Sequence, residues 1–109
     1  KVSDFTTTPG GRYKAYGDFS GEWFRDEYLI PCLQRYGDQF ILDLDGVMGY
    51  ALSWLEEVFG GAVRKMVNVD HLNSVVANAI CKDEPAYLDE IKGLIYDQIS
   101  RYAHKNYFE

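Results

Sequence analysis

A short apolar run that ends in two aspartates constrains the fold of this chain more than any other feature. The run Phe40–Leu42 is followed by Asp43, Asp45 and Gly46. A continuous stretch of bulky apolar residues bounded by turn residues is typical of a strand that is buried on both faces. Such a strand lies at the centre of a sheet. The sequence therefore predicts an α/β fold in which helices cover this strand.

Further strands are predicted on either side of this run. β-branched and aromatic residues between glycines and prolines predict edge strands at Val2–Thr8 and Arg12–Tyr16. The segment Ser74–Cys81, which reads SVVANAIC, is interpreted as another strand, although Ala77 and Ala79 leave a helix as the competing interpretation. The expected core of the fold is a small mixed β-sheet of about four strands.

Three segments have apolar residues at helical spacing and are predicted to be the main helices. The first begins after Ser20, which suits an N-cap, and a kink is expected at Pro31. The second begins at Ser53, because Ser53 and Glu56 have the spacing of a capping box. The third begins at Pro85, a residue that is favoured in the first turn of a helix.

The second predicted helix contains an adjacent pair of glycines, Gly60 and Gly61. Each glycine costs a helix about 1 kcal/mol relative to alanine, so such a pair indicates that another backbone approaches closely. The acidic pair Glu56 and Glu57 is interpreted as part of a solvated helix face.

The size and the charge of the chain exclude several classes of protein. With 109 residues, 47% of them hydrophobic, the sequence suits one compact domain over residues 1–109. The net charge is −6 and the basic residues are scattered, so we expect neither nucleic acid nor an anionic membrane as a partner. No apolar stretch approaches the roughly 20 residues that span a bilayer, and no signal peptide is recognisable.

The cysteines and histidines indicate no metal site. Cys32 and Cys81 lie in apolar patterns without a CxxC spacing, and we interpret them as buried free thiols of a protein in the reducing cytoplasm. His71 and His104 lie far apart without the spacing of metal ligands. No glycine-rich phosphate loop is present, and no cofactor is expected.

Asp43 and Asp45 raise the question of whether the chain is an enzyme. The letters DLDGV resemble the strand-end motif of the haloacid dehalogenase superfamily, which implies Asp43 as nucleophile, Asp45 as general acid or base and Mg²⁺ as the neutralising ion. In the alternative interpretation, Asp43, Asp45 and Gly46 form a turn held by side-chain to backbone hydrogen bonds. We favour the turn, because too few residues follow Val47 to supply the several strands that the superfamily's sheet requires.

A longer pattern is more specific than DLDGV. The segments DFSGEWFRDEYLIPCL and FILDLDGVMGYALSWLEEVFGGAVR resemble the prokaryotic STAS-like domain family of unknown function. That family reads SGE-x-FR, a leucine-rich helix with proline, an LDLDGV-type strand and then S-F-L-(D/E)-E-x-F-G-G. The residues that match in order are Ser20–Glu22, Phe24–Arg25, Pro31, Asp43–Val47, Ser53, Leu55–Glu57 and Phe59–Gly61.

The resemblance implies a fold similar to that of the anti-sigma factor antagonists, which are binding proteins and not enzymes. In those proteins a histidine-kinase-like ATPase binds the loop and helix after the central strand, and phosphorylation of a serine there breaks the complex. The resemblance implies this role for Ser53, while Leu52 stands where antagonists commonly have the acceptor serine. The implied partner-binding residues are Gly49, Tyr50, Leu52, Ser53, Trp54 and Glu57.

Three functions remain open at the level of sequence. The favoured one is a non-catalytic regulatory module that binds a protein partner such as a histidine-kinase-like ATPase. The second is a Mg²⁺-dependent aspartyl phosphatase that uses Asp43 and Asp45. The third is a homo-oligomeric structural component, for example a homodimer, which is suggested by tyrosines at Tyr13, Tyr16 and in the segment Tyr102–Phe108.

Overall fold

The computed structural model describes residues 1–108 and their side chains as far as Arg101. Within these residues the chain is helical, and the predicted mixed β-sheet is not formed. The strand pairing between described residues is an isolated parallel bridge that joins Asp43 to Ile80. The predicted α/β fold with a sheet of about four strands is therefore wrong.

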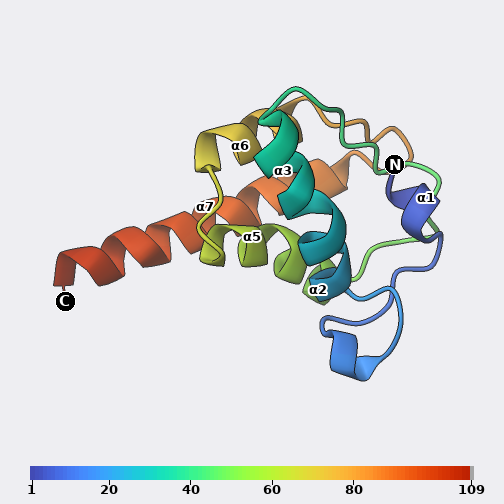
Figure 1. The fold of residues 1–109 in the computed structure, drawn as a ribbon, viewed down its shortest axis with the longest axis horizontal. Helices are drawn as coiled ribbons and strands as arrows, with labels where there is room; N and C mark the ends of the chain where they lie inside the picture. The colour runs from blue at the N-terminus through green and yellow to red at the C-terminus, as the bar shows by residue number, and fades with distance from the viewer. Residues whose placement is uncertain (109) are drawn as a thin grey trace.

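The helical elements are joined by connections of different lengths, the longest of which is residues 37–51 between α3 and α4. In chain order they are α1 (Val2–Phe5), the 3₁₀ helix η1 (Lys14–Tyr16), α2 (Gly21–Phe24), η2 (Arg25–Leu29), α3 (Ile30–Tyr36), α4 (Leu52–Leu55), η3 (Glu56–Gly60), α5 (Gly61–Arg64), α6 (Val69–Ala77) and α7 (Ala86–Phe108). Here η2 and η3 are π-helical turns that join their neighbours without a break. Figure 1 shows α3 in front of α7, with α6 above α5 and α1 to the right of α3.

Each of the three predicted main helices is present. The first runs through α2, η2 and α3, the second through α4, η3 and α5, and the third is α7. Their apolar residues form the core, together with the buried face of α6. The largest side chains that are completely buried are Trp54, Phe59, Leu55, Leu72, Ile91 and Ile95.

Both predicted edge strands are wrong. In Val2–Thr8 the chain turns into α1 instead, because the Thr6 amide donates to the Val2 carbonyl at 2.9 Å and the Val2 side chain is completely buried. In Arg12–Tyr16 the last three residues form the 3₁₀ helix η1. Val2–Thr8 makes only isolated backbone hydrogen bonds to the extended segment, from the Val2 amide to Asp43 and from the Met48 amide to the Thr7 carbonyl, and such single contacts do not form a stable strand pair.

The predicted strand at Ser74–Cys81 is also wrong for most of its length. Its first residues are the end of α6, the competing interpretation, and only Ile80 takes part in a strand bridge. Asn68 starts this helix, since its side chain accepts a hydrogen bond from the His71 amide at 2.9 Å. The buried residues Leu72, Val75 and Val76 recur at helical spacing, and this periodicity outweighs the β preference of the valines.

The first long helix shows how the chain accommodates Pro31. Ser20 is the N-cap as predicted, and its hydroxyl accepts a hydrogen bond from the Trp23 amide at 3.0 Å. The π-helical turn η2 comes just before the proline, and the Ile30 amide donates to the Arg25 carbonyl, five residues back. Pro31 thereby falls in the first turn of α3, where its missing N–H is tolerated.

The second long helix begins earlier than predicted. Its N-cap is Ala51, whose carbonyl accepts hydrogen bonds from the Trp54 and Leu55 amides at 3.1 Å. No side chain caps this end, so the predicted capping box of Ser53 and Glu56 is wrong. The reason is that the Glu56 carboxylate is held by two arginines elsewhere in the fold.

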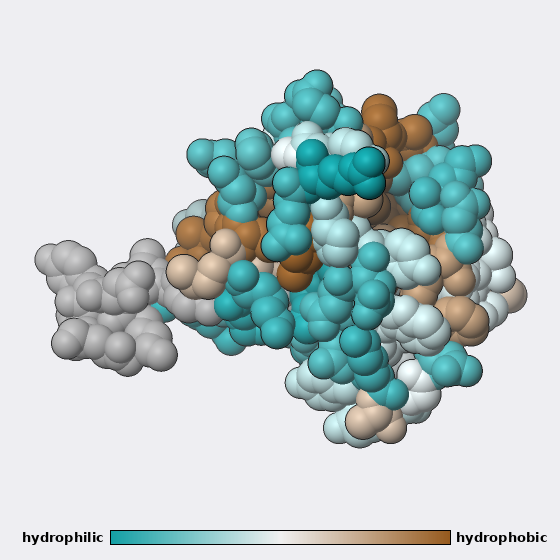
Figure 2. Space-filling model, in the orientation of Figure 1, coloured by the Kyte–Doolittle hydropathy of each residue, from teal (hydrophilic) through white to brown (hydrophobic). Residues whose placement is uncertain are grey.

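The run Phe40–Leu42 leads into an extended segment, although it is not the centre of a sheet. The Ile80 amide donates to the Leu42 carbonyl at 2.9 Å, and the Leu44 amide donates to the Ile80 carbonyl at 2.8 Å. Figure 2 shows brown, apolar side chains emerging at the top right of the molecule, over the loops that Figure 1 draws there. The segment is therefore extended and paired with Ile80 along one edge, while its other edge accepts a hydrogen bond from the Val2 amide at Asp43.

Two remaining expectations concern the thiols and the bilayer. Cys32 is half-buried and Cys81 is buried, and both are free thiols as predicted. Among residues 1–108 no helix is both long enough and apolar enough to cross a membrane.

Candidate functional site

The aspartates of the DLDGV segment hold a turn together. The Asp43 carboxylate accepts a hydrogen bond from the Asp45 amide at 3.0 Å. One Asp45 oxygen accepts the amides of Lys82 and Asp83 at 2.7 and 2.9 Å, and Asp83 in turn accepts the Gly46 amide at 2.9 Å. Gly46 has a φ of 82°, a conformation that glycine adopts without strain. The turn thus joins the extended segment to the loop before α7.

The loop after this turn buries two of the predicted partner-binding residues. The Tyr50 hydroxyl donates to the Leu44 carbonyl at 2.8 Å, and the Tyr50 amide donates to the Tyr87 hydroxyl at 3.3 Å. Burial raises the pKa of Tyr50 far above its ordinary value, so its phenol stays protonated. Trp54 is completely buried, and its indole nitrogen donates to the Phe19 carbonyl at 3.0 Å. Tyr50 and Trp54 therefore anchor the loop from inside.

Two other predicted residues lie on the surface of the same loop. Leu52 is 60% exposed, which is high for a bulky aliphatic side chain at the start of a helix. Ser53, the next residue, is exposed and its side chain caps no helix. Gly49 is half-buried and lies near the Tyr87 hydroxyl. The structure therefore separates the predicted set into an exposed pair at the start of α4 and an anchor beneath it.

The sixth predicted residue, Glu57, belongs to a buried ion pair. Arg25 and Glu57 are only 3% and 5% exposed, and an Arg25 guanidinium nitrogen donates to the Glu57 carboxylate. The guanidinium also donates to the Asp26 carboxylate at 2.8 Å. Burial opposes the charge on Arg25, but the hydrogen bond that Arg25 donates to Asp26 and the negative charges of Asp26 and Glu57 outweigh it and raise the pKa of Arg25. This pair connects η2 to η3 in the interior.

Two further arginines extend the pair into a network. Arg12 and Arg64 both bond the Glu56 carboxylate, with 2.7 Å between Arg64 and Glu56. Arg12 also reaches Glu57 at 3.3 Å, and Arg64 donates to Gln98 of α7 at 3.0 Å. Burial alone would raise the pKa of Glu56, but the hydrogen bonds from Arg64 and Arg12 lower it below its ordinary value.

The glycines of the motif make room for this network. A Cβ atom on Gly61 would lie 2.6 Å from the Arg25 guanidinium, and one on Gly60 would overlap the Glu56 carboxylate. The expected close backbone approach occurs at Gly21 instead, where a Cβ atom would lie 2.8 Å from the Trp54 carbonyl. The glycine pair is therefore required by buried side chains, and Gly21 by the packing of α2 on α4.

Sequence reasoning missed this network. It assigned Glu56 and Glu57 to a solvated helix face, whereas Glu57 is buried and Glu56 is half-buried. The available signal was the pair of glycines about one helical turn after the two glutamates, since small residues on a helix leave space for long side chains. Among residues 1–101 no group of three His, Cys, Asp or Glu side chains is arranged as metal ligands would be.

Comparison with known families now assigns the chain. Residues 20–76 match the model of a STAS-like domain of unknown function. The chain belongs to this family. No curated protein and no solved structure matches the chain significantly. The matched segment contains α2 to α5, all of α6 except its last residue, the turn at Asp43 and most of the charged network.

Within this STAS-like domain, most of the motif residues that carry the resemblance have a structural role. Ser20 caps α2, Gly21 permits the close approach of α4, and Arg25 forms the buried pair with Glu57. Pro31, Gly46 and Ser53 are the exposed motif residues, and of these Ser53 lies beside the exposed Leu52. A functional role is therefore best sought at this pair and at the surface around it.

Proposed function

We propose that this STAS-like domain is a non-catalytic protein-interaction module that regulates a partner by binding it at the start of α4. The observation that carries the proposal is the exposure of Leu52 directly beside the buried anchor Trp54. Burying an exposed leucine against a partner contributes up to about 2 kcal/mol, and a rigid helix start loses little entropy when it binds. Leu52, held in place by Trp54 beneath it, is thus suited to contact another protein.

Ser53 supplies a natural means of regulation. Its hydroxyl is exposed and no helix depends on it as a cap, so a phosphate could be added without breaking an internal contact. Phosphorylation would add nearly two negative charges in the first turn of the helix, where the helix dipole tolerates them. The same charge would repel an acidic or apolar partner surface. Phosphorylated Ser53 is therefore the released state in this proposal.

The partner class follows from the resemblance to anti-sigma factor antagonists. Those proteins bind a histidine-kinase-like ATPase through the corresponding loop and helix, and we extend this partner class to the present chain. The proposal also holds that the module acts by binding rather than by catalysis. It is supported by the way Asp43 and Asp45 use carboxylate oxygens to hold the backbone of the turn.

The experiment is a titration of the purified domain with the histidine-kinase-like ATPase encoded nearest to it. Leu52→Glu is expected to weaken binding at least tenfold, and Ser53→Glu to weaken it similarly, because both place a charge in the contact. Tyr96→Glu, which changes an exposed aromatic residue of α7, is the matched control and should bind like the wild type. Equal binding by Leu52→Glu and the wild type would refute the assignment of the surface.

A further inference from the structure

The extended segment after Phe40 has a free edge. The backbone groups of Leu42 and Leu44 bond Ile80. Because successive residues of an extended chain direct their backbone groups to opposite edges, those of Ile41 and Asp43 face away from Ile80. The hydrogen bond from the Val2 amide to the Asp43 carbonyl, 3.0 Å long, is formed on that opposite edge.

Most of the polar backbone groups on this edge have no partner within residues 1–108. Neither the amide nor the carbonyl of Ile41 forms a hydrogen bond there, and the same holds for the Asp43 amide. Unpaired groups of this kind form a template onto which another strand can add. The Ile41 side chain is 64% exposed, so the edge is accessible.

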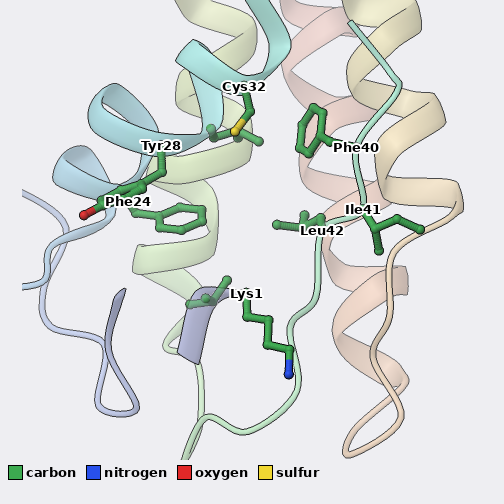
Figure 3. A pocket seen from close by; sticks show the side chains of 9 residues that line it. Lys1, Phe24, Tyr28, Cys32, Phe40, Ile41 and Leu42 are labelled. Atoms are coloured by element: carbon green, nitrogen blue, oxygen red, sulfur yellow. The ribbon is translucent and has the colours of Figure 1, made fainter. Parts of the chain in front are cut away.

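An apolar groove lies beside this edge. Figure 3 shows Phe24, Tyr28 and Cys32 on one wall, from the helix α2–α3, and Phe40 and Leu42 on the other. The cavity between the walls has a volume of about 120 Å³. An apolar cavity of about 150 Å³ holds a benzene molecule, so this one is suited to a single bulky apolar side chain.

One positive charge lies at an end of the groove and another lies in an adjoining hollow, and neither side chain forms an ion pair with a described residue. The Lys1 side chain lines the lower end in Figure 3, and its ammonium group forms no ion pair with a described residue. Arg35 lines an adjoining hollow that shares Tyr28 and Cys32, and its guanidinium contacts the Tyr36 ring rather than an acid. Glu27 of the same hollow lies 3.8 Å from Lys14. The groove is therefore locally basic in a chain whose net charge is −6.

We infer that this edge and groove receive one extended segment of a partner protein, with a bulky apolar residue at its centre and acidic residues at its ends. The segment adds as a strand to the backbone of Ile41, its central side chain enters the groove, and its acidic ends approach Lys1 and Arg35. A second copy of this chain is less well suited, because its own Ile41 edge lies beside Lys1, whose positive charge would be brought to a groove that already carries the same charge. This binding surface is separate from the proposed contact at Leu52.

The probe is a fluorescent heptapeptide with a central leucine, flanking valines and threonines, and a glutamate at each end. Its binding to the full chain is measured by fluorescence polarisation, and the amide exchange of the chain is followed by NMR. We expect saturable binding, with slower exchange of the Ile41 and Asp43 amides in the complex. Absence of binding at about 1 mM chain would overturn the inference.

The hydrogen bonds are tested on both sides of the contact. N-methylation of the peptide amides next to the central leucine should weaken binding about tenfold, because it removes donors and leaves the protein unchanged. Ile41→Pro removes an amide that the fold does not use, and Ile41→Thr is its matched control because it keeps the amide. Equal affinity for the methylated and unmethylated peptides would refute strand addition, whether or not the proline variant folds.

Three further measurements separate this inference from the alternatives. Exchanging the peptide glutamates for lysines should weaken binding to the wild type and restore it to the double variant Lys1→Glu, Arg35→Glu. Leu52→Glu should bind the peptide like the wild type, so that failure of the proposed function is distinguishable from failure of this inference. A wild-type dimer that becomes a monomer on Ile41→Pro would show that a second copy occupies the edge, which would overturn the choice of partner.

Discussion

The buried pair of Arg25 and Glu57 gives the sharpest prediction about stability. Glu57→Gln removes the carboxylate that faces the guanidinium, while the volume of the side chain stays the same. Because Arg25 is only 3% exposed, its guanidinium cannot be hydrated by water in place of the lost carboxylate. Asp26 is then the acidic residue that remains within 4 Å of it. Removing one member of a buried ion pair costs about 3 kcal/mol or more. A domain of this size has a total stability of about 5 to 15 kcal/mol, so the loss is a large fraction of it.

The assay is urea unfolding followed by the fluorescence of buried Trp54. We expect the midpoint for Glu57→Gln to fall by about 3 kcal/mol divided by the m-value, and Tm to fall by about 12 °C or more. The double variant Arg25→Met, Glu57→Leu removes both charges and should recover most of this loss. Glu27→Gln is the control, because Glu27 is an exposed glutamate of η2, the same turn that carries Arg25. A loss below about 0.5 kcal/mol for Glu57→Gln, or strict additivity in the double variant, would refute the reasoning.

Three other predictions follow from the same contacts. Gly61→Ala should destabilise the fold by about 2 kcal/mol in urea unfolding, because its Cβ would lie 2.6 Å from the Arg25 guanidinium; unchanged stability would contradict that contact. The pKa of Glu56 is lower in the folded protein than in the unfolded chain, so ionised Glu56 contributes its full stabilising free energy above the unfolded value near 4.5 and loses it as the pH falls further. The wild type should therefore lose stability more steeply below about pH 4.5 than Glu56→Gln does. Equal declines in the two proteins would count against the network. Ser20→Ala should cost about 1 kcal/mol as a lost N-cap, whereas Ser53→Ala should cost less than about 0.5 kcal/mol, and the reverse order would restore the capping box.

Helix positions were predictable because their signal is local. Apolar residues at helical spacing marked the three long helices, and Ser20 marked the start of the first one correctly. The start of the second helix was not predictable, because Ser53 and Glu56 have the right spacing for a cap while Glu56 is held by Arg12 and Arg64. Arg12 lies 44 residues before Glu56 and Arg64 lies 8 residues after it, so a four-residue capping pattern gives no information about either contact.

The sheet was predicted wrongly because strand propensity does not supply a partner. The run Phe40–Leu42 leads into an extended segment, as its composition indicates, but it finds a single bridge, at Ile80. The valines of α6 were interpreted as a strand because their helical spacing was given less weight than their β-branching. A pattern can thus specify the local conformation of a segment without specifying what lies beside it.

The structure places only part of the predicted partner-binding set on the surface. The loop after the turn at Asp43 does reach the surface at Leu52 and Ser53, but Tyr50, Trp54 and Glu57 lie in the interior. An aromatic residue in a loop can serve as an anchor or as a contact, and the sequence alone does not distinguish the two. The side chains of the segment Tyr102–Phe108, which suggested an oligomer, lie outside the described residues.

NMR mapping of the partner surface tests the central claim most directly. The isotope-labelled domain is titrated with the histidine-kinase-like ATPase encoded nearest to it, and the amide signals are followed. The account predicts that the amides of Leu52 and Ser53 shift or broaden first, and that Ser53→Glu abolishes these changes. Changes that leave Leu52 and Ser53 unaffected, or an ATPase that causes none, would contradict it.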